Sequence, residues 1–271
     1  MILVAGGDSF VWGSELSDQI ESYSNSTFPA LLAQKNNLSY VCSAWPSNAN
    51  NAITRMCLSE CQRLLKQNKQ FIVLITWTFN SRFEFRFNYD TKQKISPWYS
   101  IGPWTILDNT DDILFNTGNK NIKSQHIQNI KNARDTGISN FAKQFYKDIG
   151  NSEYYELYST FKEIVFMQNY LNVNNIPYLF TTADWQEDNY VRQADVFLTD
   201  LYAQIDWNNW YFFPAGINYN ETQKPRGFYQ WAVENKYKIG TTHPLEDAHK
   251  DATILIQEKF NEMVNKSIQS Y

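Results

Sequence analysis

The amino-acid sequence predicts an α/β fold built around a mostly parallel central sheet. Four short apolar runs, at residues 1–6, 40–44, 71–77 and 176–181, are continuous rather than alternating, which is typical of strands buried on both faces. Segments with helical periodicity separate these runs, and such an alternation favours a parallel sheet with right-handed crossovers. With 271 residues, of which 43% are hydrophobic, the chain is long enough to bury a sizeable core.

Each predicted element rests on its own pattern. The first strand, residues 1–6, runs directly into a Gly-Asp-Ser turn at residues 7–9. Helices are predicted at residues 50–67, 153–171 and 249–268, because apolar side chains recur there every three or four positions.

Residues 80–135 do not fit this alternation. They are aromatic and polar, contain Pro97 and Pro103, and show no clear period. A plain loop of about 50 residues is too long for a compact domain. We therefore predict one domain over residues 1–271, with an insertion at about 80–135 folded over the carboxyl edge of the sheet as a lid or partner-binding arm. The aromatic segment 207–217 is expected to line the same edge.

The composition excludes several classes of protein. The net charge is −4 and no dense basic run occurs, which argues against a nucleic-acid partner. No stretch reaches the roughly 18–20 apolar residues of a membrane span. The N-terminus lacks the basic start of a signal peptide, so a cytoplasmic or virion-associated protein is expected.

Neither a metal ion nor another cofactor is expected. Cys42, Cys57 and Cys61 are too few for a four-ligand zinc site and are predicted to be buried, reduced thiols. His243 and His249 lie close together in sequence, but no cluster of Cys, His and carboxylate residues elsewhere completes a metal site.

The Gly7-Asp8-Ser9 turn is the strongest candidate for chemistry. Ligands of parallel α/β sheets bind beyond the carboxyl ends of the strands, and this turn follows the first strand. Glycine permits a tight turn that exposes the serine hydroxyl. An ordinary strand-to-helix turn, with Asp8 or Ser9 as a helix cap, is the alternative.

Histidine, the usual proton carrier near neutral pH, occurs three times, as His126, His243 and His249. His243 is followed by Pro244 in a predicted loop before the last helix, a suitable place for a general base. His249 is an alternative base, but in the first turn of a helix the dipole disfavours its protonation.

Taken together, these motifs resemble those of SGNH or GDSL-type serine hydrolases, a family of esterases. The order matches, with Gly-Asp-Ser on the first turn and His-Pro before the last helix. Residues 44–53 and 77–82 are similar, more weakly, to the second and third sequence blocks of the family, whereas 80–135 is not covered. The resemblance implies a divergent member with a three-layer α/β/α flavodoxin-like sandwich.

The resemblance also implies residue roles. Ser9 would be the nucleophile and His243 its base. The oxyanion would be bound by the N–H groups of Ser9 and Ser47 and by a third donor, either Asn80 or Thr78, with Asn80 preferred as an amide. Ser47 stands where the family has glycine, which keeps the N–H but restricts the backbone.

The catalytic Asp of the family is missing, because Gly240 occupies its expected position three residues before His243. Glu246 and Asp247 follow His243, but they lie at a helix start and are expected to interact with its N-terminus. A Ser–His dyad oriented by a backbone carbonyl is therefore one possibility, and a degenerate, non-catalytic relative is another.

Substrate binding is predicted less directly. Arg82 is a candidate for an anionic substrate group, although a solvated Arg82–Glu84 face explains it equally well; Asn50 and His249 are further candidates. Aromatic residues in polar surroundings suit sugar rings or a protein interface. They lie at 98–99, 104, 185 and 207–211.

These observations predict a serine esterase that hydrolyses an acyl ester, a small molecule or an O-acyl group on a carbohydrate. The alternative is a catalytically degenerate binding or assembly module on the same fold, such as a virion or cell-surface component. A metal-dependent hydrolase ranks third.

Overall fold

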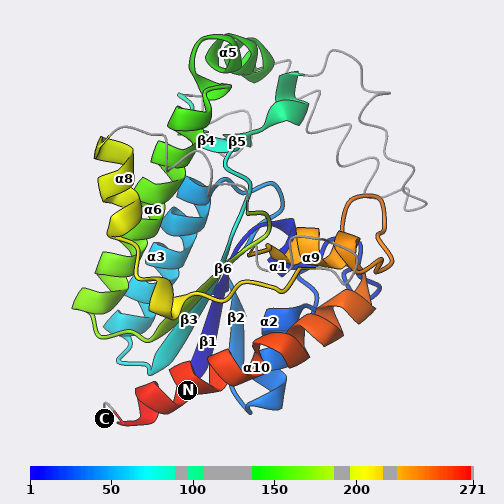
Figure 1. Ribbon diagram of the computed structural model, residues 1–271, viewed down its shortest axis with the longest axis vertical. Coiled ribbons are helices and arrows are strands. Elements are labelled where there is room, and N and C mark those ends of the chain that lie inside the picture. Colours follow the sequence, from blue (N-terminus) through cyan, green and yellow to red (C-terminus); the bar gives the residue numbers. More distant parts are fainter. Residues whose placement is uncertain (89–96, 107–135, 186–195, 216–224, 270–271) are drawn as a thin grey trace.

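The computed structural model describes residues 1–88, 97–106, 136–185, 196–215 and 225–269. A four-stranded parallel sheet with the order β2-β1-β3-β6 lies at its centre (Figure 1). The predicted α/β class and parallel sheet are confirmed. The strands are β1 (Ile2–Gly6), β2 (Ser39–Cys42), β3 (Phe71–Trp77) and β6 (Tyr178–Thr182).

The register of the sheet brings four carboxyl ends to one edge. Val4 of β1 pairs with Val41 of β2 and Val73 of β3, and Val73 pairs in turn with Tyr178 of β6. In Figure 1 the strands run upward, so that the turn after β1 lies at the upper edge of the sheet. This edge is where ligands of parallel α/β sheets bind.

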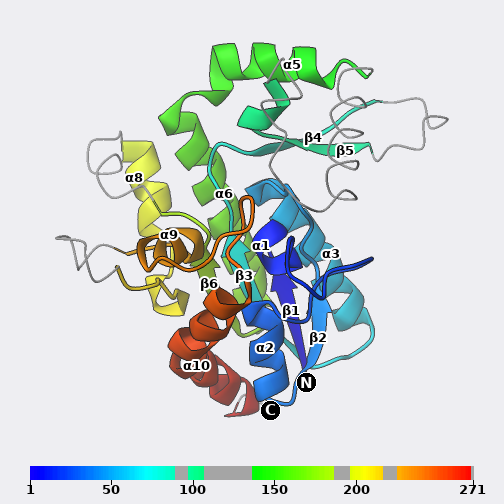
Figure 2. The same cartoon turned by 90° about the vertical axis from the view of Figure 1, so that its right-hand side faces the viewer.

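Helices cover both faces of the sheet (Figures 1 and 2). Residues of β3 alternate between two cores, with Val73 and Ile75 on one face and Ile72 and Leu74 on the other. The predicted three-layer sandwich is therefore confirmed. The first face is covered by α3 (Asn50–Lys66), α6 (Glu153–Val173) and α8 (Val196–Ala203), and the second by α2 (Phe28–Lys35), α9 (Phe228–Glu234) and α10 (Glu246–Gln269).

The long predicted helices all occur, as α3, α6 and α10, and α10 begins three residues earlier than predicted. The short helices α2, α8 and α9, of eight, eight and seven residues, were not predicted. Two turns of helix carry too few apolar positions to show a period, and tertiary packing rather than local sequence stabilises them.

The described part of the predicted insertion is ordered rather than irregular. Strands β4 (Phe83–Arg86) and β5 (Trp98–Ile101) form an antiparallel pair, and η2 (Pro103–Ile106) follows. Their side chains share a small core with α5 (Ile138–Phe145) and the π-helical turn η3 (Tyr146–Gly150). Residues 89–96 and 107–135 lie outside the described part, so the role as a lid or arm stays a prediction.

The aromatic residues after α8 form part of the core, which corrects the expectation that they lie in a polar loop. Trp210 is only 5% exposed and contacts both Trp185 and Trp207. An isolated bridge between Trp210 and Phe180 extends the edge of the sheet beyond β6. Trp185 and Trp210 are therefore unavailable for stacking against a sugar, whereas Trp207 is only partly buried.

Candidate active site

Ser9 opens the short helix α1 (Ser9–Trp12) directly beyond the carboxyl end of β1. The turn needs glycine before it, since a Cβ on Gly7 would lie 2.5 Å from Cγ2 of Val11. Ser9 is 7% exposed, and its hydroxyl makes no hydrogen bond to a described residue. As a first-turn residue, its N–H has no acceptor within the helix.

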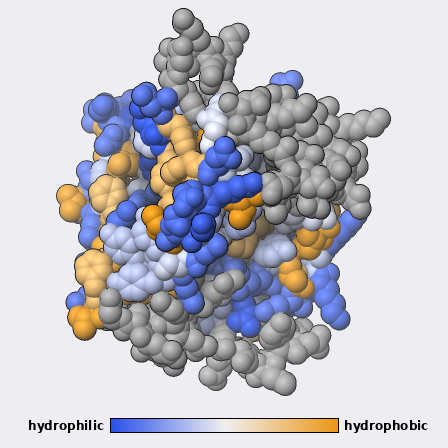
Figure 3. Space-filling view, turned by 90° about the horizontal axis from the view of Figure 1, so that it is seen from above, coloured by the Kyte–Doolittle hydropathy of each residue, from blue (hydrophilic) through white to orange (hydrophobic). Residues whose placement is uncertain are grey.

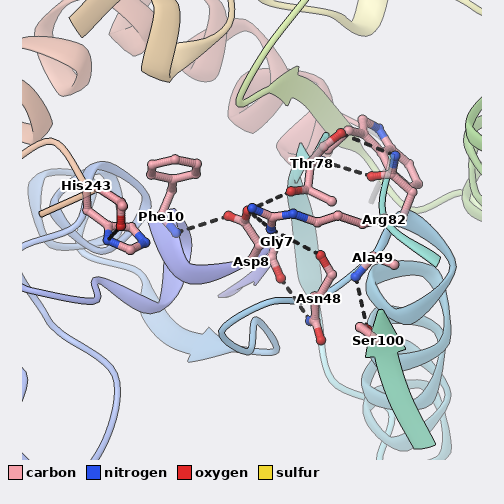
Figure 4. Close-up of polar contacts among 12 residues, drawn as sticks. Gly7, Asp8, Phe10, Asn48, Ala49, Thr78, Arg82, Ser100 and His243 are labelled. Atoms are coloured by element: carbon pink, nitrogen blue, oxygen red, sulfur yellow. Dashed lines mark hydrogen bonds and ion pairs between the residues drawn. The ribbon is translucent and has the colours of Figure 1, made fainter. Parts of the chain in front are cut away.

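Asp8 anchors this turn through a buried hydrogen-bond network (Figure 4). Its side chain is fully buried; Oδ1 accepts the Phe10 N–H at 3.0 Å, which caps α1. Oδ2 accepts the Thr78 hydroxyl at 2.6 Å and Nη1 of Arg82 at 2.7 Å. Asp8 therefore joins the Gly7-Asp8-Ser9 turn to the segment that follows β3, and the capping role considered for it is present.

The loop that carries Ser47 is held against the same turn. The Gly7 carbonyl accepts the Asn48 side-chain amide at 3.0 Å and the Trp45 N–H at 3.4 Å. Ser47 has a φ of 67°, in the left-handed region that glycine adopts most readily. Ser47 thus adopts a backbone conformation in which glycine would be favoured. The Ser47 N–H has no acceptor among the described residues.

Thr78 is not available as an oxyanion donor, contrary to one of the two expectations. It is 1% exposed, its hydroxyl donates to Asp8, and its N–H donates to Oδ1 of Asn50 at 2.8 Å. Asn80 lies half-buried between Thr78 and Arg82, both of which contact Asp8. Asn80 is therefore placed near the turn and remains the candidate for the third donor.

The structure does not support the substrate-binding roles expected for Asn50 and Arg82. Asn50 is buried, and its amide donates to the Thr78 carbonyl and to Oγ1 of Thr160. The Arg82 side chain, 12% exposed, forms an ion pair with Asp8 and lies over the rings of Phe79 and Trp104. Burial lowers the pKa of Arg82, and Asp8 opposes this shift.

His243 lies beside the helix that Ser9 begins. Its ring centroid is 5.2 Å from that of Phe10, the neighbour of Ser9 in sequence (Figure 4). Its Nδ1 lies 2.9 Å from Oγ1 of Thr242 and 3.5 Å from Oε1 of Glu15. No hydrogen bond joins His243 to Ser9.

Glu15 received no role from the sequence, yet its carboxylate faces the His243 loop. Oε2 accepts the N–H groups of Thr241 at 2.7 Å and Thr242 at 3.3 Å. Burial opposes ionisation of Glu15, but His243 and these two N–H groups outweigh it and lower its pKa. The only signal in the sequence was an acidic residue six positions after Ser9, too weak to separate from an ordinary surface glutamate.

Neither acid that follows His243 contacts it. Oε1 of Glu246 accepts the Ser17 N–H at 2.8 Å, and Asp247 pairs with Lys250 on the exposed side of α10. Both residues lie in the first turn of α10, as expected from the helix start.

His249 is a core residue, and the structure does not support its expected roles in substrate binding or as a base. It is 1% exposed, and its Nδ1 accepts the Phe28 N–H at 3.1 Å. Burial lowers its pKa to about 3, so the ring is neutral at physiological pH. His126 lies outside the described residues.

Among the described residues, no group of three or more His, Cys, Asp or Glu side chains is placed to hold a metal ion. Cys57 and Cys61 are buried free thiols, and Cys42 is a partly buried one. None of the helices in the described ranges is long and apolar enough to cross a membrane.

The upper end of the molecule in Figure 1, formed by α5 and the β4–β5 pair, lies above the site and has a mixed surface. Figure 3 views this end and shows hydrophobic residues in separate groups divided by hydrophilic ones. Exposed Trp45, 53% accessible, belongs to the Ser47 loop and packs edge-on against Trp12 with ring centroids 4.7 Å apart.

No protein-family model and no curated protein sequence matches this chain. Similar solved structures exist over nearly its whole length. A psychrotrophic esterase from Pseudoalteromonas sp. is 9% identical, with a TM-score of 0.44 and coverage of 99% of this chain and 98% of the esterase.

Two structures from Bacteroides are also similar. A GDSL-like lipase from Bacteroides thetaiotaomicron is 13% identical, with a TM-score of 0.40 and coverage of 96% of this chain and 87% of the lipase. An acylhydrolase from Bacteroides fragilis, named as putative, is 15% identical, with a TM-score of 0.39 and coverage of 96% of this chain and 86% of the acylhydrolase. Likenesses this distant do not establish the activity of this chain.

Proposed function

We propose that this chain is a divergent SGNH-type serine hydrolase that cleaves a carboxylic ester, with Ser9 as nucleophile and His243 as general base. One observation carries the proposal. The loop of His243, near the end of the chain, packs its imidazole on Phe10, so that the two motifs farthest apart in the sequence meet at the carboxyl edge of the sheet.

The orientation of His243 suits this role. Its Nδ1 faces Thr242 and Glu15, which leaves Nε2 for the Ser9 hydroxyl. Oγ of Ser9 attacks the ester carbonyl while Nε2 accepts its proton. The carbon–oxygen bond to the alcohol then breaks, and the departing alcohol takes the proton from His243. Water repeats these steps on the acyl-enzyme and releases the carboxylic acid.

Three donors are proposed for the oxyanion. The N–H of Ser9 is free of an intrahelical acceptor, and the N–H of Ser47 lies on a loop tied to Gly7. The side-chain amide of Asn80 would be the third. Because Asp8 and its partners hold these segments together, the donors would be preorganised before the substrate binds.

We further propose an O-acyl group on a carbohydrate as the substrate. Trp45 presents an exposed aromatic surface on the loop that carries the proposed donor Ser47, and Trp12 supports it. In this proposal Trp45→Ala raises KM for an acetylated oligosaccharide severalfold but leaves KM for nitrophenyl acetate near the wild-type value. An equal change for both esters would contradict the carbohydrate proposal.

Hydrolysis of an activated acetyl or butyryl ester tests the general proposal. Ser9→Ala should lose at least about 1,000-fold in kcat. Ser22→Ala, which removes the hydroxyl of an exposed serine in a nearby loop, is the matched control and should match wild type. Equal rates in wild type and Ser9→Ala would overturn the proposal.

The degenerate binding module predicts a different outcome. A fluorophosphonate probe would then leave Ser9 unlabelled, although the protein would be folded and would form a stable complex with a partner. Labelling of wild type but not of Ser9→Ala, with labelling retained in Ser22→Ala, would exclude that alternative.

A further inference from the structure

We infer that Glu15 is the positioning acid for His243, supplied from the turn after the nucleophile helix instead of from the loop of the histidine. The inference rests on the proposed function, since it assigns the group that orients its general base. A carboxylate beside Nδ1 holds the imidazole in the tautomer that can accept a proton from serine, and stabilises the imidazolium that then forms.

The contact geometry supports this role. Oε1 of Glu15 lies 3.5 Å from Nδ1 of His243, and both side chains are largely shielded, at 12% and 15% exposure. A carboxylate only accepts hydrogen bonds, so it favours the tautomer with a proton on Nδ1. The Thr242 hydroxyl, 2.9 Å from the same nitrogen, can also accept from it.

The carboxylate itself is held in place. Oε2 accepts two backbone N–H groups, from Thr241 and Thr242, so Glu15 is bonded to the same loop that it would orient. These N–H groups and His243 lower the pKa of Glu15 against the opposing effect of burial, and the group is therefore ionised near neutral pH. One oxygen fixes the loop while the other faces the imidazole.

Gly240 provides the most specific observation. A Cβ built on Gly240 would lie 2.2 Å from Oε2 of Glu15 and 3.2 Å from its carboxyl carbon. The carboxylate of Glu15 thus fills the volume into which a side chain at position 240 would project. A side-chain acid at position 240 and the glutamate at position 15 are alternative ways to fill the same space beside His243.

The backbone at Glu15 has a left-handed conformation in the structure that makes this contact. Glu15 has a φ of 71°, and Gly13 precedes it with a φ of 81°. A non-glycine residue in this region is strained because its Cβ approaches the following carbonyl oxygen, and such outliers concentrate at functional sites. Leu16, which follows, is buried at 3% exposure and helps to hold the turn.

The decisive variant is Glu15→Gln. Glutamine can still accept the Thr241 and Thr242 N–H groups, but its NH2 would then face Nδ1 and favour the unproductive tautomer. We expect kcat for an activated ester to fall about 100- to 10,000-fold with KM changed less than about threefold, because the loss falls on the transition state. Glu21→Gln, an exposed glutamate in the following loop, should match wild type.

A second-site rescue separates positioning from a merely structural role. Glu15→Ala should lose activity as Glu15→Gln does. The kcat of the double variant Glu15→Ala/Gly240→Asp should be at least about tenfold higher than that of Glu15→Ala, because the new acid enters the vacated volume. Gly240→Asp alone should destabilise the protein, since both carboxylates then compete for one site.

The outcomes distinguish this inference from the function on which it rests. If wild type and Ser9→Ala are equally inactive, the hydrolase proposal fails, and the role of Glu15 fails with it. If wild type is active, Ser9→Ala is inactive and Glu15→Gln matches wild type, only the role of Glu15 is overturned. A loss in Thr242→Val larger than that in Glu15→Gln would assign the orienting role to the Thr242 hydroxyl instead, and would also overturn it.

Discussion

At the scale of single residues, the site is built from polar groups that satisfy one another away from water. Asp8 is fully buried but accepts three hydrogen bonds, one of them from Arg82, and this network compensates for its burial next to Ser9. Ser47 has an unusual backbone conformation and His249 has a lowered pKa, and each leads to a prediction that can be measured.

Ser47 adopts a backbone conformation that glycine adopts at lower cost. Its φ of 67° leads us to expect that Ser47→Gly raises the free energy of unfolding by up to about 1 kcal/mol, while keeping the N–H and the esterase activity. Ser47→Ala, which keeps the same φ, should match wild type, and Ser47→Val should be less stable. Urea denaturation measures these differences; a Gly variant less stable than Ser47→Ala would contradict the assigned φ.

His249 should make the protein sensitive to acid. Burial lowers its folded-state pKa to about 3, against 6.5 for a free histidine, so the unfolded chain binds the proton first. The stabilisation is complete above pH 6.5 and is lost as the pH falls from there toward 3, with a slope of at most about 1.4 kcal/mol per pH unit.

His249→Asn tests this dependence, because the Asn oxygen can replace Nδ1 as acceptor of the Phe28 N–H without titrating. Urea denaturation between about pH 6.5 and 5, above the range of most carboxylates, should show a smaller slope for the variant than for wild type. Identical slopes would mean that His249 is not buried in its neutral form.

At the scale of elements, one side chain joins the start of α3 to the end of β3. Asn50 bonds both backbone groups of Thr78 and the Thr160 hydroxyl of α6. Asn51 forms the equivalent pair of bonds with the backbone of Glu84 in β4. Two consecutive asparagines thus align α3 with both the central sheet and the β4–β5 pair.

Asn50→Leu should weaken this junction. Leucine has a similar size but leaves the buried Thr78 N–H without its acceptor, which we expect to lower the free energy of unfolding by about 1–3 kcal/mol. The activity should fall as well, because Thr78 also supports Asp8. Gln62→Ala, on the exposed side of α3, is the control, and equal unfolding midpoints for the two variants would argue against the junction.

At the scale of the whole molecule, the two helical layers bury both faces of the sheet. Cys57 and Cys61 lie in the layer between α3 and the sheet, where both are fully buried. Burial raises the pKa of Cys57 to about 12 and also raises that of Cys61, so neither forms the reactive thiolate near neutral pH.

These two thiols should therefore report global unfolding. We expect a disulfide reagent such as DTNB to leave Cys57 and Cys61 unmodified in the native protein and to label them only as the protein unfolds in urea. The labelling midpoint should coincide with that of circular dichroism. Rapid labelling of both in buffer would show that this layer opens locally.

The predictions from sequence succeeded where a local pattern reports a local structure. Continuous apolar runs marked the buried strands, and the long helices α3, α6 and α10 showed their period. The strand β4 and the short helices could not be found, because their stability comes from contacts such as that of Phe83 with Phe145, which no local pattern records.

In the candidate site too, local motifs could be found from the sequence, whereas burial and hydrogen-bond partners could not. Ser9 and Ser47 were chosen from their motifs; Ser9 opens α1 and Ser47 has a φ of 67°, and their roles stay predictions. His249, Thr78 and Asn50 were chosen for their chemical type, but their burial and partners decide against the roles expected of them. Residue type states what a side chain can do, whereas burial and hydrogen bonding determine what it is free to do.

By itself, the sequence determined the α/β class, the Gly-Asp-Ser turn after β1 and the His-Pro loop before α10, since each depends on neighbouring residues. Only the tertiary structure placed Glu15 beside His243. That contact joins residues from opposite ends of the chain, and it depends on a left-handed turn at Glu15 and on the space left by Gly240. The electrostatic interaction of a carboxylate with an imidazole depends on the distance between them. For residues remote in sequence, this distance is determined by the packing of the whole fold.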